Sequence, residues 1–341
     1  MPLAGRTVDP LDLVWGVLSF PPAALLVAVV VTTIILVVSR EPGMGTVTPS
    51  VNARYVPEVR VLAIVAVTVV VVFFGEFVVR GYLVTAPGLL PWWRFAVPVA
   101  CAVVGLCVVL GVVVTRGTSV PEAPVLTAAR RGWTSFSSRA ELAVAAIVAL
   151  VSAATTIAAG LASSPDDDGN STWLVIPIPN EAAIDPIRLP FFGWSYGVPV
   201  LVCLVSLAAV AWAVLDRNAA RPFLRAETVV AERRGRRATA AGTTRIAMGA
   251  TLLSVAEAWR LIAASGTVST LSIGGGEADA TYDAAWRYAE LAVMAGWSAP
   301  VLETAALVLL LATAARGWRR PPIARESAAV AAEPAGTVTV K

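Results

Sequence analysis

Long runs of apolar residues, separated by short polar stretches, fill most of this chain. Four runs contain no charged residue and are long enough to cross about 30 Å of hydrocarbon at roughly 1.5 Å per residue. They lie at 13–39, 95–115, 142–163 and 191–215. Three further runs, at 61–83, 246–265 and 288–315, cross only if charges inside them are tolerated. The pattern predicts an all-α integral membrane protein whose residues 1–320 form a bundle of seven transmembrane helices.

Composition agrees with this class. Hydrophobic residues make up 57% of the chain and charged residues 14%, against about 45–50% and 25% in soluble domains. The mean hydropathy is +0.76. The first apolar run is too long for a signal peptide and ends without a small-residue cleavage site, so we expect it to remain as the first helix.

The distribution of arginine predicts the orientation. Arginine-rich segments follow the third, fifth and seventh runs, and the longest, 216–245, contrasts with the acidic segment 164–190. Because basic residues favour the cytoplasmic side, we expect the N-terminus outside and the C-terminus inside. Segment 164–190 is then an extracytoplasmic loop, 216–245 a cytoplasmic loop, and 321–341 a disordered cytoplasmic tail. Abundant Arg, Ala and Val suggest a GC-rich bacterial genome, and hence the bacterial inner (plasma) membrane.

Missing residue types exclude several chemistries. The chain has no His, and its single Lys is the last residue, Lys341. His-ligated haem, His-based zinc sites, Ser–His nucleophiles and an intrahelical retinal Schiff base are therefore impossible. The three Cys lie in apolar runs without paired spacing. We expect no cofactor, no metal site, no catalytic residue and no enzyme activity. With a net charge of only +3, we also expect no nucleic-acid partner.

Charged residues inside the three interrupted runs are the candidate site. Glu76 and Arg80 are four residues apart, and Glu257 and Arg260 three, so each pair shares a helix face. Glu303 lies near the middle of the last run, with no arginine within one turn. Counted from the inner arginines, the three carboxylates lie roughly 18–24 Å above the inner boundary and can share one layer. Because a charge at the bilayer centre costs about 2.5 kcal/mol or more, they should face the bundle interior.

Two interpretations of these charges stay open. In the structural one, two ion pairs and one hydrogen-bonded glutamate hold three helices together. In the functional one, they line a cavity for a proton or a small solute. Glu303, in excess over the two arginines, would then be the proton site. Pro300 would be a hinge, because its ring frees the carbonyl of Gly296.

The stretch at 76–83, EFVVRGYL, resembles the first motif of the CAAX-protease and bacteriocin-processing family. That motif has two adjacent Glu, three further residues and an Arg, and Glu76 and Arg80 match its second Glu and its Arg. Gly75 stands where the family has the Glu implied to activate water, and the family's later motifs need His. The resemblance therefore implies at most a relative without that activity.

The topology resembles that of the SWEET sugar transporters, which are built as three helices, a linker helix and three more helices. The Glu/Arg pairs of the second and sixth runs occupy similar places, as do Pro21 and Pro199. The Pro-Gln signature of that family is impossible here, because the chain has no Gln. In general character the chain resembles the multi-pass membrane proteins of actinobacteria whose activities are not established.

Two hypotheses of function follow. The first is permease-like transport of a small solute, with or without coupling to protons. The alternative is a non-catalytic membrane subunit or sensor that engages a protein partner through its arginine-rich cytoplasmic loop. Both require the lipid bilayer as a partner. A water-filled cavity that reaches Glu303 would favour the first hypothesis, and a dry, fully paired cluster the second.

Overall fold

Seven long helices dominate the computed structural model, which describes residue 16 and residues 20–38, 49–79, 91–117, 131–179, 185–273 and 280–318. All seven are long and apolar enough to cross a membrane, which confirms the predicted number within these residues. They are α2 (Pro21–Val38), α3 (Pro49–Val78), α4 (Val97–Gly117), α5 (Arg139–Ala162), α6 (Trp194–Ala220), α7 (Val229–Gly266) and α8 (Ala289–Trp318). The tail at 321–341 lies outside the described residues.

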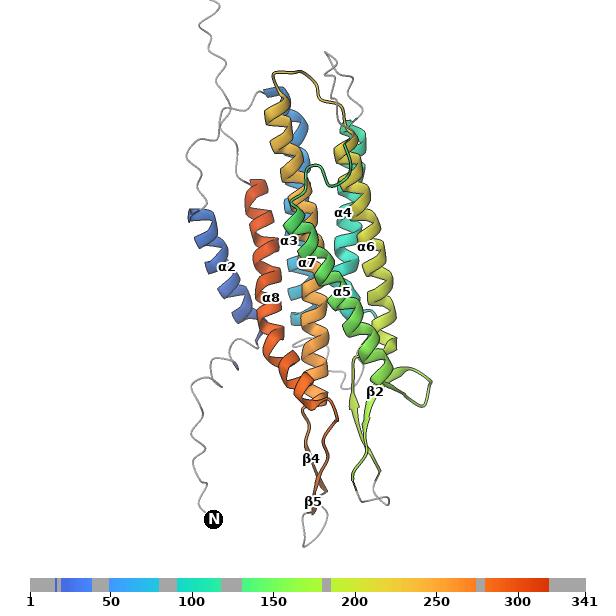
Figure 1. Ribbon diagram of the computed structural model, residues 1–341. Coiled ribbons are helices and arrows are strands. Elements are labelled where there is room, and N and C mark those ends of the chain that lie inside the picture. Colours follow the sequence, from blue (N-terminus) through green and yellow to red (C-terminus); the bar gives the residue numbers. More distant parts are fainter. Residues whose placement is uncertain are drawn as a thin grey trace, which may run out of the picture.

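Helix α7 is the centre of the bundle. It contacts α3, α4, α5, α6 and α8, whereas α2 packs against α8 at one side (Figure 1). Close approach is possible because α7 carries glycines at its contacts. A Cβ atom on Gly242 would lie 2.9 Å from Leu62 Cδ1 of α3, and one on Gly249 would lie 2.8 Å from Leu310 Cγ of α8. Small residues at helix contacts are typical of membrane bundles.

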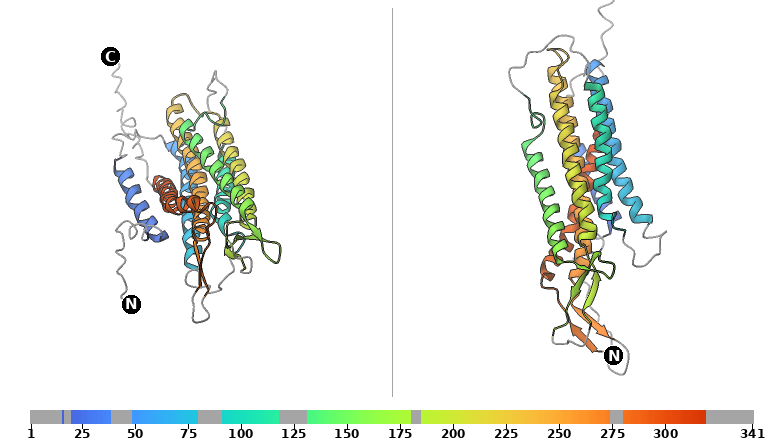
Figure 2. Two further views of the ribbon diagram at one scale, coloured as in Figure 1. Left: turned by 60° about the horizontal axis from the view of Figure 1, so that its bottom comes forward. Right: turned by 90° about the vertical axis from the view of Figure 1, so that its right-hand side faces the viewer.

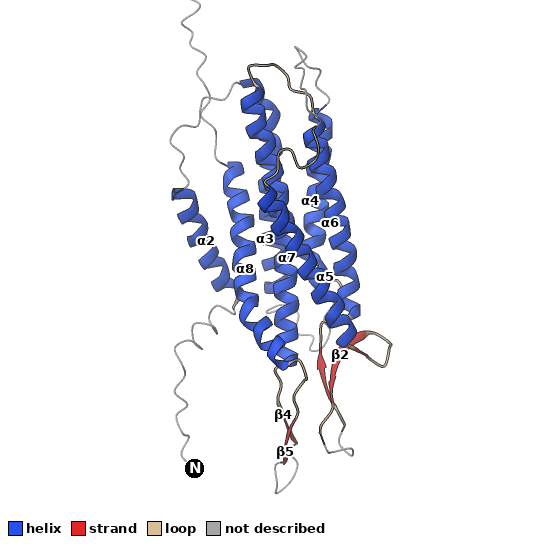
Figure 3. Ribbon diagram, viewed as in Figure 1, coloured by secondary structure: helices blue, strands red, loops and turns tan. Residues whose placement is uncertain are grey.

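Two small antiparallel sheets depart from the all-α prediction (Figure 3). One contains β1 (Ser164–Pro165), β2 (Ser171–Ile176) and β3 (Ile187–Pro190), and the other pairs β4 (Thr270–Ile273) with β5 (Ala280–Asp283). Part of the predicted loop at 164–190 is therefore strand. The reason is a period of two in β2, which buries Leu174 and Ile176 against Phe191 and Phe95.

The bundle has two different ends. Both sheets project from the same end, which we call the hairpin end (Figure 2). The opposite, arginine-rich end carries the first turns of α3 and α7 and the last turns of α4 and α6. A short 3₁₀ turn, η2 (Arg94–Ala96), precedes α4 at the hairpin end.

Helix α2 begins at Pro21, a residue type that favours the first helical position, and the predicted start at residue 13 lies outside the described residues. Two other helices begin well before their predicted starts. Helix α3 begins at Pro49 rather than at residue 61 and runs through Pro57. Helix α7 begins at Val229, so much of the predicted loop at 216–245 is helical. The extra turns of α3 and α7 are stabilised by buried polar groups that pair with each other.

Candidate functional site

Charged side chains from α3, η2, α7 and α8 gather in the part of the bundle nearer the hairpin end. We call Glu76, Arg94, Glu257, Arg260 and Glu303 the hairpin-side cluster. Glu257 lies within electrostatic range of the other four charged groups. The structure therefore brings together the three carboxylates that the sequence predicts to share a layer. Arg80, the predicted partner of Glu76, lies outside the described residues, so that pair stays a prediction.

Arg94 connects two helices of the cluster, a role that sequence reasoning missed. Its Nε lies 3.8 Å from Glu76 Oε1 of α3, and its Nη2 lies 3.7 Å from Glu257 Oε1 of α7. The η2 turn is fixed to α7 because Ser254 Oγ donates a hydrogen bond to the Phe95 carbonyl at 2.6 Å. In the sequence Arg94 only flanks an apolar run. The sequence feature that could have indicated its place is the neighbouring Phe95, an apolar residue whose burial anchors the turn in the core.

Glu303 is paired, so its prediction as the carboxylate without an arginine is wrong. Arg260 Nη2 of α7 donates to Glu303 Oε2 of α8. The partner comes from a neighbouring helix, which spacing along α8 alone could not reveal. Glu303 is 1% exposed and Arg260 25%. Helix α8 runs through the buried Pro300 as one helix and bends in its hairpin-side part (Figure 1); whether Pro300 acts as a hinge stays a prediction.

Glu257 and Glu303 each have one carboxylate oxygen that lacks a hydrogen-bond donor within the described residues. Glu257 Oε2 and Glu303 Oε1 are buried and accept no hydrogen bond from any part of the chain that the structure describes. Buried polar groups are normally hydrogen-bonded, and an acceptor left without a donor costs about 1–3 kcal/mol, more when it is charged. Each of these two atoms therefore has an unfilled acceptor position that a proton or a cationic group could take.

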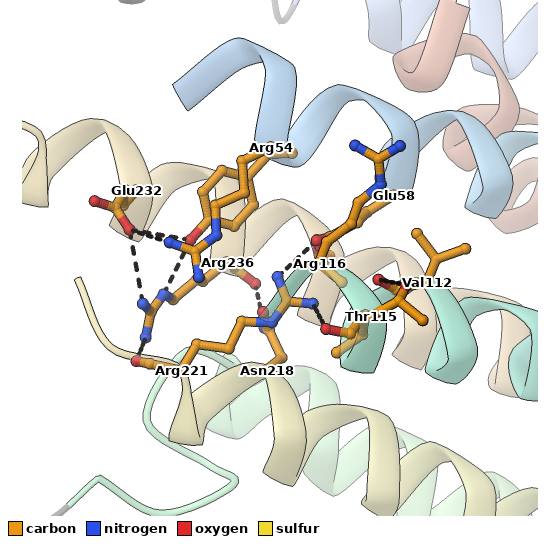
Figure 4. Close-up of polar contacts among 12 residues, drawn as sticks. Arg54, Glu58, Val112, Thr115, Arg116, Asn218, Arg221, Glu232 and Arg236 are labelled. Atoms are coloured by element: carbon orange, nitrogen blue, oxygen red, sulfur yellow. Dashed lines mark hydrogen bonds and ion pairs between the residues drawn. The ribbon is translucent and has the colours of Figure 1, made fainter. Parts of the chain in front are cut away.

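A second charged group lies at the arginine-rich end and was not predicted (Figure 4). We call it the arginine-side network; its members are Arg54, Tyr55, Glu58, Asn218, Arg221, Glu232, Arg236 and Thr239. Arg221 Nη1 donates to Glu58 Oε1 at 2.6 Å, and its Nη2 donates to the Val113 carbonyl at 2.9 Å. Thr239 Oγ1 donates to Glu58 Oε2 at 3.2 Å. Glu58 is thus bound by Thr239 of α7 and by Arg221, the residue that follows α6.

Arg236 is fully buried in the same network. It donates to the carbonyls of Arg221 and Pro222 at 2.8 and 3.0 Å and from Nε to Tyr55 Oη at 3.2 Å. Its other neighbour, Glu232, lies at 3.7 Å and accepts hydrogen bonds from Thr228 Oγ1 and the Leu224 amide. The sequence signal was present, because Glu232, Arg236 and Thr239 follow one face of a helix. The surrounding run of arginines obscured this pattern, because the preference of basic residues for the cytoplasmic side already explains such a run.

The two groups of charges differ in how tightly they are held. Every ionised side chain of the arginine-side network is at most 5% exposed, whereas Arg94 of the hairpin-side cluster is 28% exposed and Glu257 16%. The pairs of Arg94 exceed the usual hydrogen-bond length. Between the two groups lies an apolar layer that includes Leu62, Ile246, Leu253 and Leu310.

A groove of about 720 Å³ opens between α5, α7 and α8 near the hairpin end. It is mostly apolar and includes Trp259, Trp286 and Met294, but not Glu303. In the described residues, no three Cys, Asp or Glu side chains are arranged to hold a metal ion. All three Cys are free, and Cys107 is exposed on α4.

Comparisons with known proteins give no relative: no family model, no curated protein and no solved structure matches this chain. The class to which the fold belongs is a mostly helical protein with seven helices suited to a membrane.

Proposed function

We propose that the protein is a permease-like transporter of a small solute and that the hairpin-side cluster is its solute or proton site. The observation that carries this proposal is the pair of buried carboxylate oxygens without a donor, Glu257 Oε2 and Glu303 Oε1. In the arginine-side network, by contrast, both oxygens of Glu58 accept hydrogen bonds. Carboxylates kept only for stability would be expected to be bound in that way, whereas a transport site needs groups that can exchange partners.

The proposal includes insertion into the bacterial plasma membrane, with the arginine-rich end in the cytoplasm and the hairpin end outside. Arg217, Arg233 and Arg237 are exposed at the first end, and Asp167 at the second. Cytoplasmic loops carry the excess of arginine, which supports this orientation. The hairpin-side cluster then lies nearer the outer surface, and the apolar layer closes the route to the cytoplasm.

Transport through this arrangement requires α7 and α8 to separate in the apolar layer. Pro300 supports such a movement, since a proline inside a helix removes one backbone hydrogen bond. The chemistry of the cluster favours a solute with a cationic group or a proton, because the oxygens without donors belong to carboxylates. Arg94, held by two long ion pairs, is the group that could move to admit a solute.

The test is proton movement in liposomes that contain the purified protein and the pH dye pyranine. A panel of amino acids and sugars is added outside, with a membrane potential set by potassium and valinomycin. We expect at least one solute to drive acidification of the interior, and Glu257→Gln and Glu303→Gln to reduce its rate at least about tenfold. Glu290→Gln, at an exposed carboxylate in the first turn of α8, is the matched control and should leave the rate unchanged.

Equal rates in the wild type and in both cluster variants would contradict the proposal, as would the absence of flux with every solute. The second candidate is a non-catalytic membrane subunit or sensor that engages a protein partner. The exposed Arg233, Arg234 and Arg237 in the first turns of α7 favour it, because they leave a basic surface at the arginine-rich end.

A further inference from the structure

Three arginine side chains converge on one phenylalanine at the arginine-rich end. The guanidinium carbons of Arg131, Arg236 and Arg233 lie 4.0, 4.3 and 5.9 Å from the centre of the Phe223 ring. Phe223 is buried in the turn between α6 and α7. An aromatic face attracts cations, but a single ring cannot neutralise three of them.

Two of these arginines also share one acceptor. Arg131 Nη1 and Arg236 Nη1 both donate to the Arg221 carbonyl, at 3.3 and 2.8 Å. Their positive charges are thus held close together by one uncharged oxygen. Burial, with Arg236 and Arg233 nearby, lowers the pKa of Arg131, which reflects this crowding of positive charge.

Within the described residues, the carboxylates of the arginine-side network are fewer than its arginines. Arg54, Arg221 and Arg236 face only Glu58 and Glu232 in the arginine-side network, and both carboxylates are already bound by these partners. Within the described ranges, Arg131 and Arg233 form no ion pair with a carboxylate. Arg131 is half-buried and Arg233 is exposed, so an anion can reach both from the outside of the bundle.

We propose that Arg131 and Arg233, on the buried Phe223–Arg236 base, bind a phosphate group. A planar guanidinium donates two parallel hydrogen bonds to phosphate oxygens, and a bound dianion or monoanion removes the repulsion between the arginines. The phosphate can belong to the headgroup of an anionic lipid or to a soluble phosphate compound. This site lies at the opposite end from the hairpin-side cluster and does not depend on the transport proposal.

The test uses the full-length protein in neutral detergent. Native mass spectrometry measures binding of phosphatidylglycerol, with diacylglycerol of the same acyl chains as the phosphate-free control. A thermal shift measures binding of inorganic phosphate at constant ionic strength, since salt screens such contacts. We expect phosphatidylglycerol, inorganic phosphate or both to bind the wild type, and Arg233→Gln to weaken binding about tenfold. Arg217→Gln, at an exposed arginine of α6, is the matched control and should bind like the wild type.

Binding of phosphatidylglycerol alone would identify a lipid headgroup as the source, binding of inorganic phosphate alone a soluble compound, and binding of both the phosphate group itself. Because Arg233 is exposed, its substitution should leave the fold intact; Arg131→Gln tests the second contact. The proposal is overturned if neither probe binds, if diacylglycerol binds as well as phosphatidylglycerol and phosphate does not bind, or if Arg217→Gln weakens binding as much as Arg233→Gln.

Discussion

At the scale of single residues, Glu58 and Glu257 differ in how their carboxylates are bound. Glu58 accepts hydrogen bonds at both oxygens, at 2.6 Å from Arg221 and at 3.2 Å from Thr239. Glu257 has one ion pair at 3.7 Å and one buried oxygen without a donor. Both are carboxylates inside long apolar helices, so the difference lies in their partners and not in residue type.

The Glu58–Arg221 pair should therefore stabilise the fold only while both partners are present. Glu58→Gln should cost about 3–5 kcal/mol, because it leaves a buried guanidinium without its counter-charge. The double variant Glu58→Leu with Arg221→Met should recover much of that loss, since two apolar groups need no partner. Thermal unfolding of the purified variants measures both. A double variant less stable than Glu58→Gln would contradict this account.

At the scale of elements, α7 sets how closely its neighbours approach. Its glycines contact Leu62 of α3 and Leu310 of α8. Its first turns carry Glu232 and Arg236, and its last turns Glu257 and Arg260, so one helix holds parts of both charged groups. A movement of α7 against α8 would therefore reach both ends of the bundle.

Gly249→Ala should destabilise the contact between α7 and α8. The new methyl group would lie 2.8 Å from Leu310 Cγ and 3.2 Å from the Ala306 carbonyl oxygen, so the backbones must separate. Overpacking of this kind costs about 1–3 kcal/mol. Gly111→Ala is the control: nothing lies near its Cβ position in α4, and it should stabilise by up to about 1 kcal/mol. Similar unfolding temperatures for the two variants would refute the packing argument.

The seven helices could be predicted from the sequence because each contains an apolar run long enough to cross a membrane. The partners that side chains find on neighbouring helices could not be predicted in this way. Arg94 and Arg260 reach Glu257 and Glu303 from other helices, a proximity that no spacing along one helix encodes. The first turns of α7 were missed for a related reason, since Arg236 is stabilised by groups of α3 and of the turn after α6. The short strand β2 was not predicted, because the prolines near it indicate irregular structure.

At the scale of the whole molecule, the two ends carry opposite charge. If the arginine-rich end is cytoplasmic, a membrane-impermeant maleimide should label Asp167→Cys in intact cells and Arg237→Cys only after lysis. Both positions are exposed. The background variant replaces Cys101, Cys107 and Cys203 by Ala, so that labelling reports only the new thiol. Labelling of Arg237→Cys, but not of Asp167→Cys, in intact cells would reverse the proposed orientation.

The central claim is that the hairpin-side cluster serves function and the arginine-side network serves stability. Its most direct test is the free energy of unfolding of Glu257→Gln and Glu303→Gln beside that of Glu58→Gln, all in one detergent. We expect Glu257→Gln to lose less than about 1 kcal/mol, because its ion pair with Arg94 is 3.7 Å long and partly exposed. Glu303→Gln should lose less than Glu58→Gln, because the arginine it leaves behind, Arg260, is 25% exposed and can reach water. Glu58→Gln should lose about 3–5 kcal/mol. Equal and large losses in all three variants would make the hairpin-side cluster a structural clamp and contradict the account.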